Sequence, residues 1–192
     1  ITSLIDKIMH SSEDYPTLYI CFTPDEEVGD GAKYFNYDYF KVDFAYTLDG
    51  GPINVFNYEN FNAASAKVIV NGKSIHPGEA KDKMINSINV AMEFDSLLPK
   101  QKRPEYTEMY EGFNHLNGIN GGVQTTELDY IIRNHNAHLL EVQKGEFENA
   151  KEFLNKKYGP NTIELIITDS YQNMKEFIVP HPEILELPKK AL

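Results

Sequence analysis

Between residues 61 and 168, segments with the hydrophobic period of a strand and segments with that of a helix follow one another in a defined order. Alternating apolar and polar residues indicate half-buried strands, and apolar residues at helical spacing indicate amphipathic helices. The expected segments are a strand over 61–71, a helix over 79–98, a strand around 112–116, a strand over 123–133, a helix over 137–157 and a strand over 161–168. This order predicts a ferredoxin-like βαββαβ module with an α+β fold.

The sequence before this module has a different pattern. Apolar segments at 18–22 and 44–48 predict strands, and a short acidic and aromatic helix is expected from Gly29 to about Tyr39. Strands that alternate with helices indicate part of an α/β sheet. We therefore expect an α/β plus α+β organisation, in which the module is inserted into an α/β domain. The expected parts are 1–58 from the α/β domain, 59–170 as the inserted module and 171–192 as the return into the first domain.

The composition limits the classes of partner. With 18 basic and 29 acidic residues the net charge is −11. Without a basic stripe, such a chain is not expected to bind nucleic acid or an anionic membrane surface. No apolar run approaches the roughly 20 residues of a membrane span. The single cysteine, Cys21, cannot form an intrachain disulfide and fits a reducing compartment. Since the sequence starts without Met and ends within a helix-like pattern, we expect a fragment of a longer protein.

An acidic run follows the first predicted strand. Glu26 and Glu27 come directly after residues 18–22, at the kind of strand end where ligands bind in α/β sheets. One carboxylate there can hold a cation while the other takes a proton from water. The same run also fits an ordinary helix start, with Thr23 as N-cap and Pro24 as the first helical residue. The run alone leaves structure and function open.

Three further residues extend this acidic run into a possible constellation. Asp49 follows the second predicted strand, His76 precedes the first helix of the module, and Arg133 ends one of its strands. A metallopeptidase needs carboxylate and imidazole ligands, a general base and an oxyanion donor, and these residue types are present. There is no compact HExxH motif, so spacing alone does not define a metal site.

Seven segments add a resemblance that covers nearly the whole chain. They are FTPDEEVG (22–29), YTLDGG (46–51), NFNAASA (60–66), HPGEAK (76–81), YEGFNHL (110–116), YIIR (130–133) and DSYQNM (169–174). Together they closely resemble the peptidase T family, the tripeptide aminopeptidases among the di-zinc exopeptidases. The resemblance implies a zinc-exopeptidase α/β domain that carries the module as a lid.

The resemblance also implies a role for each candidate residue. Glu26 would be the general base that deprotonates a water bridging two zinc ions. Glu27 would ligate one zinc ion and Asp49 the other. His76, in the lid, would stabilise the oxyanion or bind the peptide carbonyl. Arg133 would bind the substrate, most naturally through a carboxylate, which suits its forked guanidinium.

The resemblance implies that the parent enzyme releases the N-terminal residue of tripeptides. It also implies that this enzyme is cytoplasmic and holds two zinc ions per subunit. The family's remaining metal ligands would lie outside this sequence, so the fragment alone is expected to hold an incomplete metal site and to be inactive. Two alternatives stay open. The parent could act on dipeptides or N-acyl amino acids, or the chain could be a non-catalytic lid module. Such a lid would form homodimers through an open sheet edge.

Overall fold

The chain divides into two units, residues 1–55 and residues 56–191, which we call the N-terminal unit and the sheet unit. The structure is a computed structural model and describes residues 1–28 and 31–191. Within the described residues, no helix combines the length and the apolar character that crossing a membrane requires.

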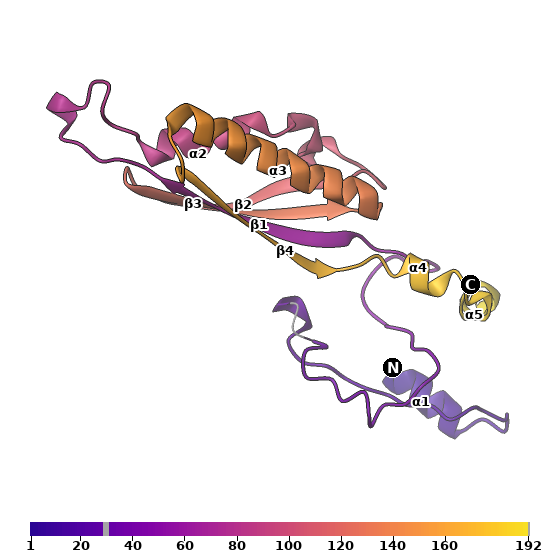
Figure 1. Ribbon diagram of the computed structural model, residues 1–192. Coiled ribbons are helices and arrows are strands. Elements are labelled where there is room, and N and C mark those ends of the chain that lie inside the picture. The colour runs from indigo at the N-terminus through magenta and orange to yellow at the C-terminus, as the bar shows by residue number, and fades with distance from the viewer. Residues whose placement is uncertain (29–30, 192) are drawn as a thin grey trace. The chain divides into compact units, whose positions relative to one another are not determined.

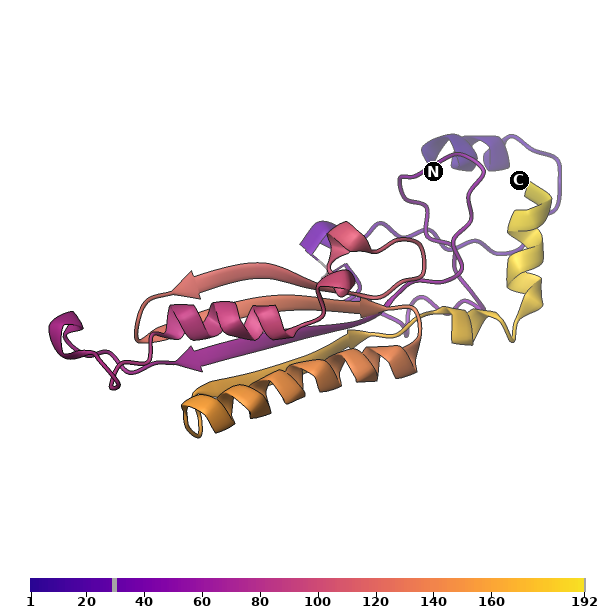
Figure 2. The same ribbon diagram turned by 90° about the horizontal axis from the view of Figure 1, so that it is seen from above.

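The sheet unit is built on four antiparallel strands, ordered β2-β3-β1-β4. Helices α2 and α3 connect β1 to β2 and β3 to β4, and both cover the same face of the sheet (Figures 1 and 2). The bounds are β1 Asn62–Asn71, α2 Ser87–Leu97, β2 Phe113–Gly121, β3 Thr125–Asn134, α3 Ala137–Tyr158 and β4 Ile163–Tyr171. This arrangement confirms the predicted ferredoxin-like βαββαβ fold.

The core lies between the sheet and its two helices. Every second residue of β1 faces the helices, which explains the alternation seen in the sequence. The largest buried side chains are Phe94 of α2 and Phe147 of α3, both with no exposed surface, and their rings lie 6.1 Å apart. The other buried apolar residues of this cluster are Ala64, Ala66, Val68, Val70, Val90, Ala91, Leu98, Leu128, Tyr130, Ile132, Leu140, Ala150, Leu154 and Ile163.

The two ends of the sheet have different neighbours. At one end, which we call the root, β1 begins and β3 ends, with Ala63 paired to Arg133. At the other end, the tip, β1 finishes at Asn71 opposite Thr125. Two short helices, α4 (Lys175–Ile178) and α5 (Pro182–Ala191), follow β4 beyond the root (Figure 1).

A long loop leaves the tip and carries the 3-10 helix η2, Pro77–Glu79. Figure 2 shows this loop projecting beyond the end of β1. The prediction of a helix from residue 79 is wrong in its start, because α2 begins at Ser87, where Asn86 caps it by accepting a hydrogen bond from the Ile88 N–H at 3.0 Å. A bridge between Lys73 and Ile85 holds the intervening residues in the loop.

The remaining bounds differ from expectation in smaller ways. The segment between α2 and β2 contains two 3-10 helices, η3 (Lys100–Lys102) and η4 (Pro104–Tyr106). Strand β2 continues to Gly121, beyond the strand predicted around 112–116. A side chain at Gly121 would place its Cβ 2.4 Å from the Thr126 Cα, so only glycine allows this close approach of β3.

Among its described residues, the N-terminal unit has two short helical elements, α1 (Thr2–Met9) and the 3-10 helix η1 (Glu26–Val28). The strands predicted over 18–22 and 44–48 are wrong, since neither segment has strand structure. A strand needs a neighbour to satisfy its backbone hydrogen bonds, and neither segment pairs with another described residue. Of the helix predicted over 29–39, Gly29 lies outside the described residues, and residues 31–34 and 37–39 form turns.

Candidate functional site

The two adjacent glutamates lie together on η1 of the N-terminal unit. Glu26 and Glu27 open this single turn, and both side chains are exposed. The preceding residue, Asp25, has a φ of +59°, in the left-handed region, so the predicted helix start with Thr23 as N-cap and Pro24 as first residue is wrong. An L-residue in this sparsely populated conformation is a form of local strain that often occurs at functional sites.

Asp49 lies in an irregular segment of the same unit, and its side chain is exposed. The Gly50 N–H donates a hydrogen bond to Asp49 Oδ1 at 2.7 Å, which holds the carboxylate against its own turn. The second carboxylate oxygen, Oδ2, is the atom that a cation could approach.

A zinc site takes three or four protein ligands. Among the described residues, no group of three or more His, Cys, Asp or Glu side chains comes together in a way that could hold a metal ion. The chemistry of Glu27 and Asp49 suits a divalent cation, but two carboxylates are too few. The described residues by themselves therefore do not fit the two-zinc site that the family resemblance implies.

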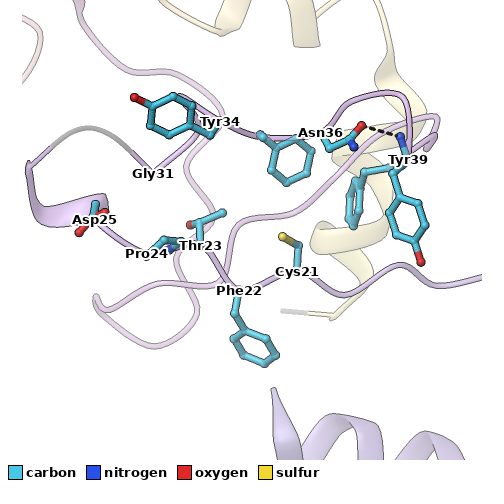
Figure 3. A pocket seen from close by; sticks show the side chains of 11 residues that line it. Cys21, Phe22, Thr23, Pro24, Asp25, Gly31, Tyr34, Asn36 and Tyr39 are labelled. Atoms are coloured by element: carbon cyan, nitrogen blue, oxygen red, sulfur yellow. Dashed lines mark hydrogen bonds between the residues drawn. The ribbon is translucent and has the colours of Figure 1, made fainter.

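A hollow of about 410 Å³ lies next to the acidic turn, between residues 21–25 and 31–40. Aromatic side chains dominate its wall, as Figure 3 shows for Tyr34 and Tyr39, whereas the ring of Phe22 points away from the others. Asp25 lines it, but Glu26, Glu27 and Asp49 do not.

His76 lies on the tip loop of the sheet unit and is exposed. It is the N-cap of η2, and its Nδ1 accepts a hydrogen bond from the Gly78 N–H at 3.2 Å. Its expected position at the entry of the first long helix is wrong, because α2 starts eleven residues later, at Ser87.

Arg133 lies at the root, on β3, and is half-buried. Its Nη1 donates to the carbonyl oxygens of Ala64 at 3.0 Å and Ile132 at 2.9 Å. The guanidinium also lies over the ring of Tyr171, 5.4 Å from the centroid, in a cation–π contact. These three contacts hold the guanidinium in one orientation.

His76 and Arg133 are therefore at opposite ends of the sheet. The ten residues of β1 separate root from tip, and a strand of that length spans about 30 Å at roughly 3.3 Å per residue. An extended tripeptide is only about 10 Å long. Within one sheet unit, the structure does not bring these two candidate residues to one small substrate.

A partly buried cluster of an acid, a lysine and a histidine at the root was missed by the sequence reasoning. The Glu59 carboxylate, whose side chain is 10% exposed, lies 3.2 Å from Lys175 Nζ and 3.8 Å from His135 Nδ1. Burial alone would raise the pKa of Glu59. Two effects together outweigh it: the hydrogen bond and the charge of Lys175, and the hydrogen bonds from Tyr110 and Asn173. The net result is that the pKa of this carboxyl is lowered.

Asparagine side chains tie the same region together. Asn62 Nδ2 donates to the carbonyl oxygens of Asn134 at 3.1 Å and His135 at 3.0 Å, and Asn62 Oδ1 accepts from the Asn173 N–H at 2.9 Å. Asn60 Oδ1 accepts from the Met174 N–H at 2.7 Å. The density of asparagines around residues 60–62 and 134–136 was the available signal, but it does not reveal their partners.

The geometry defines the class of protein: a ferredoxin-like α+β domain whose root joins two segments distant in sequence, together with a unit that exposes adjacent carboxylates. Residues 58–161 match the family described as the peptidase dimerisation domain. The chain belongs to this M20 peptidase dimerisation domain family.

Relatives extend this similarity beyond the matched domain. The chain is 48% identical over 193 residues to Peptidase T of Alkaliphilus oremlandii, covering 100% of this chain and 47% of that protein. It is 50% identical over 192 residues to Peptidase T of Clostridium perfringens, again covering 100% of this chain and 47% of that protein. The chain thus spans about half the length of these relatives.

Solved structures share the fold. A tripeptidase from Staphylococcus aureus superposes with a TM-score of 0.67 at 21% identity, covering 79% of this chain and 41% of that chain. The aminopeptidase PepT from Bacillus cereus gives 0.65 at 21% identity, with the same coverage of both chains.

Proposed function

We propose that the full-length protein is a tripeptide aminopeptidase, a hydrolase that releases the N-terminal residue of tripeptides. The observation that carries this proposal is the 48% identity to a Peptidase T, which extends over the whole chain. The cytoplasm as its location, and zinc as its metal, belong to the same proposal.

In this proposal the acidic residues of the N-terminal unit supply part of the hydrolytic machinery. Glu26, exposed on η1, takes a proton from the water that attacks the peptide carbonyl carbon. A bound metal ion would activate the water and polarise the carbonyl, and Glu27 and Asp49 would be two of the carboxylates that hold it. Because the described residues gather no group of three potential ligands, the metal site needs further ligands from the full-length protein.

The proposed domain roles follow from the same similarity. Residues 1–58 form part of the catalytic α/β domain, residues 59–170 form the lid and dimerisation domain, and residues 171–192 return towards the catalytic domain. The match of residues 58–161 to the peptidase dimerisation domain supports the second of these roles. Apolar side chains exposed in the N-terminal unit, among them Leu18 and Phe44, fit a segment whose sheet partners lie elsewhere.

Arg133 is proposed to bind the C-terminal carboxylate of the peptide. Its Nη1 is held by two backbone carbonyls and its guanidinium rests on Tyr171. A guanidinium fixed in this way loses little freedom when a carboxylate binds the rest of its fork. This geometry would favour peptides with a free C-terminal carboxylate over peptides whose C-terminus is blocked.

The separation of His76 from Arg133 gives the proposed homodimer a function. One sheet unit cannot present both residues to a tripeptide, because about 30 Å of strand lies between root and tip. A second copy could bring its tip loop to the root of the first. The site is therefore proposed to combine Arg133 of one subunit with His76 of the other.

Activity measurements on the full-length protein test this proposal. Purified enzyme is expected to cleave tripeptides in preference to dipeptides and N-acyl amino acids, and Glu26→Gln should abolish turnover while the metal content stays unchanged. Faster hydrolysis of an N-acyl amino acid would favour the related hydrolase instead. Loss of metal together with activity would contradict the role of Glu26 as base.

The second candidate function is self-association of a non-catalytic lid module. The observation behind it is the match to the dimerisation domain, together with the edge strands β2 and β4, which each pair on one side only among the described residues. Light scattering of the 192-residue chain tests it. A strict monomer at high concentration would remove this candidate.

A further inference from the structure

His76 has a fixed hydrogen-bonding arrangement on the tip loop. As N-cap of η2 it accepts, through Nδ1, the N–H of Gly78 at 3.2 Å, while the Glu79 N–H donates to the His76 carbonyl oxygen at 2.8 Å. Pro77 lies between them and has no N–H. Gly78 is therefore the first residue of the turn that can donate to the imidazole.

This contact decides which nitrogen carries the proton. A backbone N–H can only donate, so Nδ1 of His76 must accept and cannot itself be protonated in this arrangement. In a neutral imidazole the proton then lies on Nε2. In this arrangement the ring presents one donor, Nε2–H, to its surroundings.

Glycine at position 78 allows the imidazole to approach so closely. A Cβ added there would lie 3.3 Å from His76 Nδ1 and 3.4 Å from its Cε1, which is tighter than ordinary contact. A Cβ at this position would require the ring to shift by a few tenths of an ångström and so lengthen the hydrogen bond. Gly145 on α3 offers a contrast, because a Cβ at that position meets nothing within 4 Å.

We propose that Gly78 is a positioning residue that fixes His76 as an Nε2–H donor for the carbonyl oxygen of the scissile peptide bond. This inference rests on the proposed function, in which His76 meets that carbonyl. It adds the residue that sets the orientation and the tautomer of the His76 imidazole, through the Gly78 N–H. A donor aimed at the oxygen before it becomes charged is the arrangement that stabilises an oxyanion.

Magnetic resonance on the isotope-labelled 192-residue chain tests the arrangement without any activity. The chain has six histidines, so the His76 signals are assigned by their loss in His76→Gln. We expect a nitrogen–nitrogen coupling across the hydrogen bond between the Gly78 amide and His76 Nδ1, with the ring proton on Nε2. Gly78→Ala should remove or weaken this coupling, and Gly145→Ala should leave it unchanged. A ring proton found on Nδ1 would overturn the inference.

Kinetics of the full-length enzyme test the positioning role. Removing an oxyanion donor lowers kcat by about 100-fold or more, and we expect Gly78→Ala to lower kcat on the order of tenfold, since a misdirected donor keeps part of its effect. In a His76→Ala background, Gly78→Ala should cause no further loss, because it acts through the imidazole. Gly145→Ala should match wild type.

The outcomes separate this inference from the proposed function. If Gly78→Ala lowers kcat equally in the wild-type and the His76→Ala backgrounds, the positioning role of Gly78 is overturned. The aminopeptidase proposal is then left intact. Full activity of His76→Ala would overturn the proposed role of His76 and, with it, that of Gly78. No hydrolysis of any tripeptide by the wild-type enzyme would overturn the proposed function itself.

Discussion

Asn62 and Asn173, 111 residues apart in sequence, join the strand that enters the sheet unit to the segment that leaves it. The Asn173 N–H donates to Asn62 Oδ1 at 2.9 Å, and both residues are buried. From the other side of its amide group, Asn62 Nδ2 donates to the carbonyl oxygens of Asn134 and His135. One side chain thus ties three segments together at the root.

Asn62→Ala should destabilise the sheet unit strongly. The change removes this side-chain partner from the buried Asn134 carbonyl and the buried Asn173 N–H, and each unsatisfied buried group costs about 1–3 kcal/mol. The His135 carbonyl keeps a hydrogen bond from Asn173 Nδ2. We expect the free energy of unfolding to fall by about 2–4 kcal/mol, measured by urea denaturation. Asn120→Ala, at an exposed position on β2, is the matched control and should change it by less than about 0.5 kcal/mol. Equal effects of the two variants would contradict the role of Asn62.

Glu59 should make the stability of the sheet unit sensitive to acid. Burial raises the pKa of Glu59, but Lys175, Tyr110 and Asn173 outweigh burial, so the folded-state pKa lies below the unfolded one. The stabilisation is therefore complete above the unfolded pKa of about 4.3 and is lost as pH falls through the folded value. Denaturation midpoints should decline from pH 5 towards pH 3.

Glu59→Gln is the comparison for this acid dependence. It keeps the shape of the side chain but removes the titrating group, so its midpoint should decline less over the same pH range. Both proteins contain all the other acidic residues, so the effects of those residues cancel when the two midpoints are compared. A decline as steep in Glu59→Gln as in wild type would show that Glu59 does not contribute.

The parts of the fold that the sequence predicts are those with local causes. The alternation in β1 and the long amphipathic pattern of α3 gave bounds within one or two residues of those observed, because burial of one face determines both patterns. The start of α2 was missed because Ile85 pairs with Lys73, a contact that no helical periodicity reports.

Features with distant partners could not be predicted. The segment 18–22 has a strand-like composition, but its backbone needs neighbouring strands, and the described residues do not supply them. At the root, Glu59 and Lys175 are 116 residues apart, so only the fold brings their charges together. The candidate residues of the site were identified by resemblance, whereas the positions of His76 and Arg133 at opposite ends of the sheet required the structure.

Phe94→Ala should show where the stability of the sheet unit originates. Phe94 has no exposed surface and packs between the sheet and Phe147. Removing such a ring leaves a cavity and costs about 3–5 kcal/mol. Met92 is on the same helix, but its side chain is 56% exposed. Met92→Ala should lower the free energy of unfolding by less than about 1 kcal/mol. Urea denaturation compares the two, and a similar loss for both would contradict the assignment of the core.

Zinc should bind the 192-residue chain only weakly. The described residues gather no group of three potential ligands, whereas tight zinc binding needs three or four. After dialysis with zinc and removal of free metal, elemental analysis should find less than one ion per chain, and a chelator should leave the unfolding midpoint unchanged. Two retained ions per chain would mean that this chain assembles a site that its described geometry does not contain.

Tyr171 should influence substrate binding through Arg133. The Tyr171 ring lies 5.4 Å from the Arg133 guanidinium, and an exposed cation–π contact is worth about 0.5–1 kcal/mol. In the full-length enzyme, Tyr171→Leu frees the guanidinium and should raise KM for tripeptides by about two- to fivefold, with little change in kcat. Tyr171→Phe keeps the aromatic face and should behave as wild type. Because the effect depends on a substrate carboxylate, tripeptide amides should not distinguish Tyr171→Leu from wild type. A rise in KM for the amides as large as for the free acids would show that Tyr171 supports the fold of the root and does not orient Arg133.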